Sequence, residues 1–241
     1  MRSRIFYTDK YIEIAQNIKR FLNRQKNFLA RANIESTRAT GDAIQNIISE
    51  GFQTLLGKAC TECITKLGRR AMGDVTFKDP DGICYAVDVK THRIDTHFNM
   101  PNLTSVERLA SFYESDKNCF VILLVTYAIS GMKVKVSNVL FVPIEFLGWD
   151  CLTVGALGRG QIQIRNSNTI SLNPQYSRKD WMLEFCERLF KFYPKERTKI
   201  AKSIARFHAV QSAWLAKADT WTAPPVEPRK VIETSGTETP T

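Results

Sequence analysis

The sequence has few histidines, only one paired cysteine motif and no long apolar run. It contains three histidines and six cysteines, and Cys60-x-x-Cys63 is not accompanied by a second such pair or by a His-x-x-x-His pattern. A structural zinc site takes four ligands, so this composition argues against one. No apolar run reaches the length that crosses a membrane, and the first residues lack the apolar centre of a signal peptide. We therefore expect an intracellular protein with reduced cysteines.

Acidic side chains are outnumbered by basic ones. Asp and Glu number 24 and Lys and Arg number 34, which gives a formal net charge of +10. This surplus favours a polyanionic partner such as nucleic acid. The 241 residues, 44% of them hydrophobic, suffice for one domain with its own core. We expect an arm over residues 1–40 that contacts the DNA backbone or a second subunit, a core over 41–218 and a disordered tail over 219–241.

The stretch from Gly73 to Arg93, GDVTFKDPDGICYAVDVKTHR, predicts a β-hairpin. A short apolar run leads into an Asp-Pro-Asp-Gly turn, and a second run rich in Ile, Tyr and Val returns from it. Residues two apart on a strand share a face, so Asp88 and Lys90 project together. An antiparallel partner strand brings Asp74 beside them.

Two carboxylates and one ammonium group suit metal-assisted hydrolysis of a phosphodiester. Magnesium prefers oxygen ligands, and paired carboxylates repel each other unless a cation lies between them. The metal acidifies a water and balances charge in the transition state. Lys90 then positions or deprotonates that water, or holds the scissile phosphate. A surface hairpin whose Asp and Lys side chains are simply solvated is the alternative.

The pattern Asp74…Asp88-Val89-Lys90 resembles the PD-(D/E)XK nuclease motif. GDVTF…YAVDVKT followed by MPNLTSVERLASFY resembles type II restriction endonucleases of the blunt-cutting EcoRV and HincII kind. The resemblance implies an α/β fold with a restriction-endonuclease-like core, a central mixed sheet flanked by helices. It also implies Mg²⁺ held by Asp74, Asp88 and Val89, and a cytoplasmic, bacterial homodimer. Such an enzyme cleaves double-stranded DNA at a short palindromic site and leaves 5′-phosphate ends.

The sequence departs from this family at the first aspartate of the motif. That aspartate often follows proline, whereas Asp74 follows Gly73. A literal Pro80-Asp81 pair is present, but it falls in the predicted turn, away from Asp88. We interpret the Pro80-Asp81 pair as a decoy.

Two segments precede the first core helix. Residues 9–32 show helical spacing of apolar residues, with a basic face that contacts phosphates or is solvated. Residues 33–41 are polar and predict a linker. In the resembling enzymes a linker at this place follows the DNA backbone or minor groove, which makes Arg38 a candidate DNA contact.

A long amphipathic helix is predicted from about Asp42 to Lys66. Its apolar stripe includes Cys60 and Cys63, which favours core packing over metal binding for both. Glu50 lies off the stripe. The resembling enzymes often carry an acidic residue on this helix that assists the metal site, so Glu50 is a catalytic candidate, with a solvated glutamate as the alternative.

The segment from Thr91 to Asn102 is too polar and irregular to predict an element, and we interpret it as a loop against the substrate. Its candidate contacts to phosphates or base edges are Thr91, Arg93, Asn99 and Asn102. His92 and His97 are interpreted as loop residues or DNA contacts rather than metal ligands.

The remaining periodic segments predict ordinary core elements. Residues 105–113 predict a helix, 120–127 a strand buried on both faces, and 133–144 a further strand, followed by a short turn or helix over 144–149. Two helices are predicted over 178–193 and 195–217, separated by Pro194.

The stretch LTVGALGRGQIQIR, from Leu152 to Arg165, predicts a glycine-rich loop and an alternating strand. Gln and Arg side chains read adenine and guanine in the major groove. In the resembling enzymes a loop before such a strand reads that groove, so Arg159, Gln161 and Gln163 are candidate readers. The alternative is a glycine-rich turn into an edge strand.

Two other functions fit part of the pattern. A PD-(D/E)XK nuclease of DNA repair or junction resolution would keep the same triad and cut by structure rather than sequence. A non-catalytic DNA-binding protein would explain the charge but not Asp74, Asp88 and Lys90.

Overall fold

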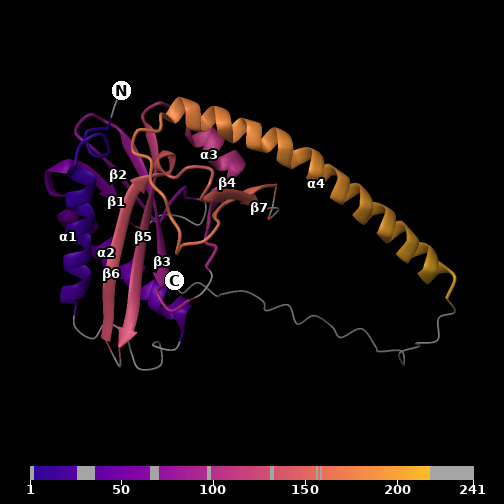
Figure 1. Cartoon of the computed structure of the whole chain (residues 1–241), viewed down its shortest axis with the longest axis horizontal. Coiled ribbons are helices and arrows are strands. Elements are labelled where there is room, and N and C mark those ends of the chain that lie inside the picture. The colour runs from indigo at the N-terminus through magenta and orange to yellow at the C-terminus, as the bar shows by residue number, and fades with distance from the viewer. Residues whose placement is uncertain are drawn as a thin grey trace, which may run out of the picture. The chain divides into compact units, whose positions relative to one another are not determined.

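The computed structural model describes residues 3–25, 36–65, 71–96, 99–130, 133–155, 157 and 159–217. The chain divides into two compact units, Met1–Tyr193 and Pro194–Thr241. The first unit contains a five-stranded sheet in the order β1-β2-β3-β5-β6 and a three-stranded sheet in the order β4-β8-β7 (Figure 1). The protein is therefore α/β with a mixed central sheet flanked by helices, as the sequence predicts.

The central sheet has one parallel pair. Its strands are β1 (Glu62–Ile64), β2 (Val75–Lys78), β3 (Cys84–Arg93), β5 (Asn118–Ser130) and β6 (Lys133–Pro143). β3 and β5 run parallel, whereas β1–β2, β2–β3 and β5–β6 are antiparallel. The small sheet is antiparallel and consists of β4 (Asn102–Ser105), β7 (Leu152–Gly155) and β8 (Gln161–Ile164).

Four α-helices accompany these strands in the described ranges. They are α1 (Lys10–Arg24), α2 (Thr37–Leu56), α3 (Val106–Phe112) and α4 (Arg178–Leu215). Short 3-10 helices cover Gly57–Ala59 and Ile144–Phe146. No helix among the described residues has both the length and the apolar character to cross a membrane.

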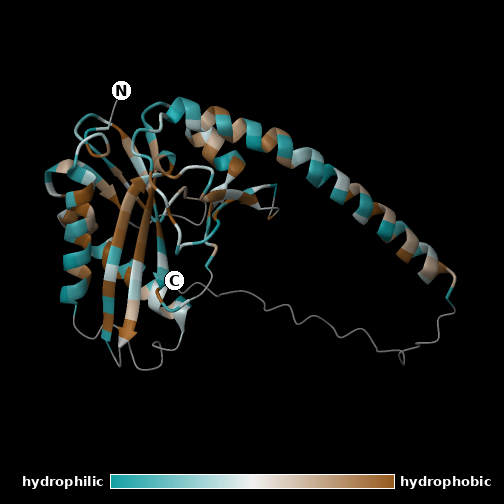
Figure 2. Ribbon diagram, viewed as in Figure 1, coloured by the Kyte–Doolittle hydropathy of each residue, from teal (hydrophilic) through white to brown (hydrophobic). Residues whose placement is uncertain are grey.

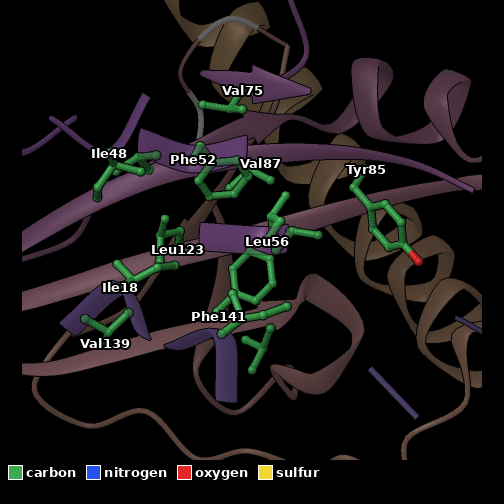
Figure 3. Packing of buried hydrophobic residues seen from close by; sticks show 14 of the residues in the cluster. Ile18, Ile48, Phe52, Leu56, Val75, Tyr85, Val87, Leu123, Val139 and Phe141 are labelled. Atoms are coloured by element: carbon green, nitrogen blue, oxygen red, sulfur yellow. The ribbon is translucent and has the colours of Figure 1, made fainter. Parts of the chain in front are cut away.

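The central sheet separates two hydrophobic clusters. Alternate residues of a strand face opposite sides, so Val87 and Val89 join α1 and α2 in the first cluster, while Ala86 faces the second cluster with α3 and the small sheet. Figure 3 shows Ile48 and Phe52 of α2 packed close to Val87 in the first cluster. The central strands are largely hydrophobic in Figure 2. In β5 the hydrophobic residues are continuous, because this strand is covered on both faces of the sheet.

Several predicted elements are confirmed. β5 contains the apolar run 120–127, whose residues are nearly all buried, β6 covers most of 133–144, and α3 lies within 105–113. The short helix after β6 is also present.

The predicted linker and the ends of the following helix are wrong. Ser36 caps α2 by accepting a hydrogen bond from the Ala39 N–H at 3.2 Å, so helix begins at Thr37 within the segment interpreted as a linker. The helix ends at Leu56 because Gly57 adopts a positive φ of 54°. Cys60 and Cys63 therefore do not continue a helical stripe, although both pack against the first cluster.

The predicted loop from Thr91 to Asn102 is also partly wrong. β3 continues to Arg93, because the parallel ladder with β5 extends to the Arg93–Tyr127 pair. Asn102 begins β4. His92 is 2% exposed and hydrogen-bonds Asn168 Oδ1 through Nε2 at 2.6 Å, so it is a buried residue rather than a loop contact. His97 lies outside the described residues.

The terminal helices differ from their predicted bounds. α1 ends at Arg24 and buries Ile14, Ile18 and Leu22 against the first cluster, within the same compact unit as the sheet. The rest of the predicted helix and the start of the linker, residues 26–35, lie outside the described part. α4 is a single helix with Pro194 inside it, rather than two helices separated by that proline. The predicted disordered tail also lies outside the described residues.

Candidate active site

The hairpin β2–β3 brings Asp74 opposite Asp88. Val75 pairs with Val87 in the antiparallel register, and one further step of the same register places Asp74 across from Asp88. The Asp74 N–H donates to the Val87 carbonyl at 2.7 Å and continues the ladder. The Asp74 carboxylate accepts a hydrogen bond from the Val89 N–H at 2.7 Å. Asp74 is therefore fixed at the open end of the hairpin by two main-chain contacts.

Gly73 allows this close approach. A Cβ atom at position 73 would lie 2.5 Å from the Val87 carbonyl oxygen, nearer than real Cβ contacts occur. Proline carries a Cβ, so it does not fit here without a shift of β3. This contact gives a physical reason for the glycine that stands where the resembling motif often has proline.

Asp74, Asp88 and Lys90 belong to one face of the sheet. Their strand neighbours Val75, Val87 and Val89 pack in the first cluster, so by alternation the three charged side chains belong to the other face. Lys90 Nζ lies 2.8 Å from Asp88 Oδ1. Asp88 is only 6% exposed, and its second oxygen, Oδ2, is buried without a hydrogen-bond partner among the described residues. The lysine thus satisfies half of a buried carboxylate.

Burial is the main electrostatic influence on Asp88. It raises the pKa of Asp88 to about 7, because desolvation penalises the charged form. Lys90 opposes this rise, Asp74 adds to it by like-charge repulsion, and Arg108 opposes it more weakly. The protonated form of Asp88 is therefore favoured more than in an exposed aspartate, and an additional cation would favour the ionised form.

The residues at this point fit a hard divalent cation. Asp74 and Asp88 supply carboxylate oxygens, and Asp88 Oδ2 is a buried acceptor that has no partner among the described residues. The Val89 N–H points to the β2 edge of β3, so its carbonyl shares that edge, beyond Val75, the first residue of β2. Magnesium commonly takes one or two carboxylates and fills its shell with water and phosphate oxygens. No group of three or more His, Cys, Asp and Glu residues gathers in the described ranges, and this ligand set does not need one.

The two cysteines of the Cys60-x-x-Cys63 motif pack against the first cluster, as interpreted from the sequence. Burial raises the pKa of Cys63 to about 11 and also raises that of Cys60. A structural zinc site needs four ligands, and no group of three or more His, Cys, Asp and Glu residues that could hold a metal gathers around them in the described ranges.

Glu50 is not brought together with the triad. It is exposed on α2, whose buried residues pack on the first cluster, on the face of the sheet opposite Asp88 and Lys90. Pro80 and Asp81 lie in the turn at the other end of the hairpin, as predicted. Asp81 forms a 2.8 Å ion pair with Arg4 there.

The predicted DNA contacts that follow the triad in the sequence make different contacts within the protein. A Cβ on Gly41 of α2 would lie 2.8 Å from Thr91 Oγ1, so Thr91 lies against the start of that helix. Arg93 pairs with Asp95 at 2.7 Å. Asn99 accepts two hydrogen bonds from Ser167 through its carbonyl and contributes to the fold.

The other residues predicted to contact DNA bases lie in or next to the small sheet. Ile162 and Ile164 of β8 are buried and Gln161 and Gln163 are partly exposed, as the alternation predicts. β8 is the central strand, so the alternative of an edge strand is wrong. Gln163 Nε2 donates to Asn102 Oδ1 of β4 at 2.5 Å, which joins two predicted contacts. Arg159 is exposed before β8, and Arg38 is exposed in the first turn of α2.

Arg108 is a site residue that the sequence analysis missed. It lies on α3, donates to the Ala71 carbonyl just before Gly73, and lowers the pKa of Asp88 electrostatically. Its segment predicts a helix, but nothing local in the sequence shows that this helix faces the end of β3. The N-terminal cap of α3 by Ser105 was the available signal, because it fixes Arg108 in the first turn.

Comparison of the chain with known proteins identifies no family for it. No protein-family model matches the chain, and no curated protein matches it.

Proposed function

We propose that the protein is a Mg²⁺-dependent endonuclease of the type II restriction class with a restriction-endonuclease-like core. The observation that carries the proposal is the open end of the β2–β3 hairpin. There Asp74 stands opposite Asp88, Lys90 pairs with one oxygen of Asp88, and the other oxygen is buried with no partner in the part of the chain that the structure describes. A buried charge that is left half satisfied costs stability, which favours a functional reason for it.

Each residue of the site has a separate task. Asp74, Asp88 and the Val89 carbonyl would hold the magnesium ion. When bound, the ion acidifies a water and offsets charge on the scissile phosphate. Asp88 would hold the ion as a carboxylate, and a nearby cation would favour that ionised form of a carboxyl whose pKa burial raises to about 7. Lys90 then orients the attacking water or the phosphate. Breakage of the P–O3′ bond leaves a 5′-phosphate and a 3′-hydroxyl.

The rest of the molecule suits double-stranded DNA as substrate. The net charge of +10 favours a polyanion and predicts binding that weakens with salt. Arg159, Gln161 and Gln163 accompany the β7–β8 hairpin and carry the side-chain types that read base edges. Cleavage of both strands of a palindrome calls for a two-fold homodimer with one site per chain. A cytoplasmic bacterial enzyme is the corresponding setting.

The test is digestion of a sequenced viral genome by the purified chain with Mg²⁺. We expect discrete fragments whose mapped ends share one short palindrome and carry 5′-phosphates. A structure-specific repair or junction nuclease would leave the linear duplex uncut and cleave branched DNA instead. A DNA-binding protein without catalysis would shift the DNA and cut neither substrate.

The Asp88→Ala variant tests whether the cleavage comes from this site or from a contaminating nuclease. We expect it to abolish Mg²⁺-dependent cleavage while it keeps DNA affinity measured without metal. The matched control is Asp81→Ala, which removes a carboxylate at the opposite end of the same hairpin. Equal cleavage by wild type and Asp88→Ala would refute the proposed site.

A further inference from the structure

The second compact unit carries an apolar stripe along helix α4. Between Pro194 and Leu215, six positions recur at alternating spacings of three and four residues, the repeat of a helix that packs on another helix. We call these positions the α4 seam, and four of the six are apolar: Arg197, Ile200, Ile204, Phe207, Gln211 and Trp214. Phe207 is 68% exposed and Trp214 is 66% exposed, so the larger part of both rings faces solvent. Figure 2 shows hydrophobic residues recurring along this part of α4.

Most charged residues in the described part of this unit, up to Lys217, lie away from the seam. Four cations share one side of the helix, more than a quarter turn from the seam centre: Lys195, Lys199, Lys202 and Arg206. The positions that border the middle of the seam are small or neutral: Ala201, Ser203, His208 and Val210. A second helix can therefore approach the seam without meeting like charges along its edges.

We propose that the α4 seam binds the α4 seam of a second copy of this chain in antiparallel orientation. The alternating spacing is the same in both directions, so an antiparallel pair places seam residues opposite one another along the whole length. Three kinds of layer result: Ile204 with Phe207, Ile200 with Gln211, and Arg197 with Trp214. Such a contact is self-complementary, as a two-fold homodimer requires.

Charge favours the antiparallel orientation over the parallel one. A parallel pair places Arg197 opposite its own copy inside the seam, where two guanidinium groups repel each other. The antiparallel pair places Arg197 over the ring of Trp214 in the second copy. Lys217 Nζ lies 4.1 Å from the centroid of the Trp214 ring within one chain, so this ring accepts a cation. The antiparallel pair also brings Glu196 of one copy towards Lys217 of the other.

The exposed area fits a reversible dimer. Complete burial of the exposed parts of the four apolar seam side chains would remove roughly 500 Å² per copy from solvent, or roughly 1,000 Å² for two copies, which is the size of a weak or transient interface. In an antiparallel pair the two rows of four cations lie on the same side of the dimer. A polyanion on that side offsets their mutual repulsion, so we expect DNA to strengthen the pairing.

The test is cysteine cross-linking of the full chain, with exposed Cys186 replaced by serine. In the proposed pair, Phe207 is level with Ile204 of the second copy, so the two Phe207 residues are offset by three residues, about 5 Å along the helix axis. Trp214 is level with Arg197, so the two Trp214 residues are offset by 17 residues, about 26 Å. A bismaleimide as short as the spacing of packed helices, about 8–10 Å, should link Phe207→Cys into covalent dimers. It should not link Trp214→Cys, nor Ala209→Cys on the opposite side of α4.

A mixture of two variants tests the register. Chains with Arg197→Cys and chains with Trp214→Cys should cross-link to each other when mixed, while neither links to itself. Linking of Phe207→Cys no greater than that of Ala209→Cys would overturn the pairing. Self-linking of Trp214→Cys would show a parallel pair and overturn the orientation. The inference does not rest on nuclease activity, and the test uses neither DNA nor magnesium, so each proposal can fail without the other.

Discussion

One hairpin contains two buried aspartates with opposite surroundings. Asp79, 4% exposed at the turn, accepts hydrogen bonds from the Asp81 and Ile83 N–H groups at 3.0 and 2.9 Å and from the Tyr85 hydroxyl at 2.7 Å. Asp88, 6% exposed at the open end, pairs with Lys90 through one oxygen, and its other oxygen contacts no hydrogen-bond partner within the described ranges. The two carboxylates are equally buried, but only one is fully satisfied.

This difference separates a structural carboxylate from the one that we propose holds a cation. The hydrogen bonds of Asp79 fix the turn, with Gly82 supplying the positive φ of 77° that the turn needs. Asp88 adds nothing of this kind, and its burial beside Asp74 costs free energy. We interpret that cost as preparation for a cation, which would contact the unpaired oxygen of Asp88.

Removal of the carboxylates at the open end of the hairpin should have the largest effect. Asp88→Ala or Asp74→Ala should slow Mg²⁺-dependent cleavage at least about a thousandfold, equivalent to ~4 kcal/mol of transition-state stabilisation. Single-turnover rates measure this, with Asp81→Ala as the control that should cleave at the wild-type rate. A variant without Asp88 that retains most of the activity would place the chemistry elsewhere.

Lys90→Met should have the next largest effect. Loss of the ammonium group removes its contact to water or phosphate and should slow the single-turnover step about a hundredfold. It also removes the charge that lowers the pKa of Asp88, so more Mg²⁺ should be needed at pH 7. Lys78→Met is the matched control, because Lys78 pairs with Glu62 at the turn end of β2. Equal rates for the two variants would contradict a role for Lys90.

Asp88→Asn should stabilise the metal-free protein at high pH. The pKa of Asp88 is about 7 when folded and about 3.9 when unfolded, so the native state holds its proton more tightly. Wild type therefore loses stability as pH rises from about 4 to about 7, whereas the amide cannot ionise. Above pH 7 the variant should gain up to about 4 kcal/mol, and the gain should vanish near pH 4. Urea unfolding at pH 4 and pH 8 measures it, and a pH-independent difference would exclude this explanation.

Asp79→Ala should destabilise the protein, whereas Asp88→Asn should stabilise it, and the change in unfolding free energy should be smaller. It leaves the buried Ile83 N–H, the partly buried Asp81 N–H and the Tyr85 hydroxyl without their Asp79 acceptor, which should cost about 2–3 kcal/mol of unfolding free energy. Cleavage per folded molecule at low temperature should stay at the wild-type level. A loss of activity without a loss of stability would mean that both aspartates serve the reaction.

The hairpin and its triad were predictable because their signals are local. The Asp-Pro-Asp-Gly composition gives the turn, and strand alternation places Asp88 and Lys90 on one face. The β5 strand was equally visible, since a strand covered on both faces is a continuous apolar run.

Two of the features that the sequence did not predict depend on contacts between distant segments. Nothing near Thr91 shows that β5 pairs with β3 as far as Arg93, and nothing near Arg108 shows that α3 faces Asp88. The start of α2 was missed because its first turn is polar, although the Ser36 cap was present. Pro194 predicts a break, yet α4 continues through it.

The most direct test is the binding of Mn²⁺, in place of Mg²⁺, to the protein at pH 8, followed by electron paramagnetic resonance. Our account predicts one site in wild type and in Asp79→Asn, weakened at least about tenfold by Asp74→Asn or Asp88→Asn. Binding that is equal in all four proteins would contradict a cation site at the open end of the hairpin.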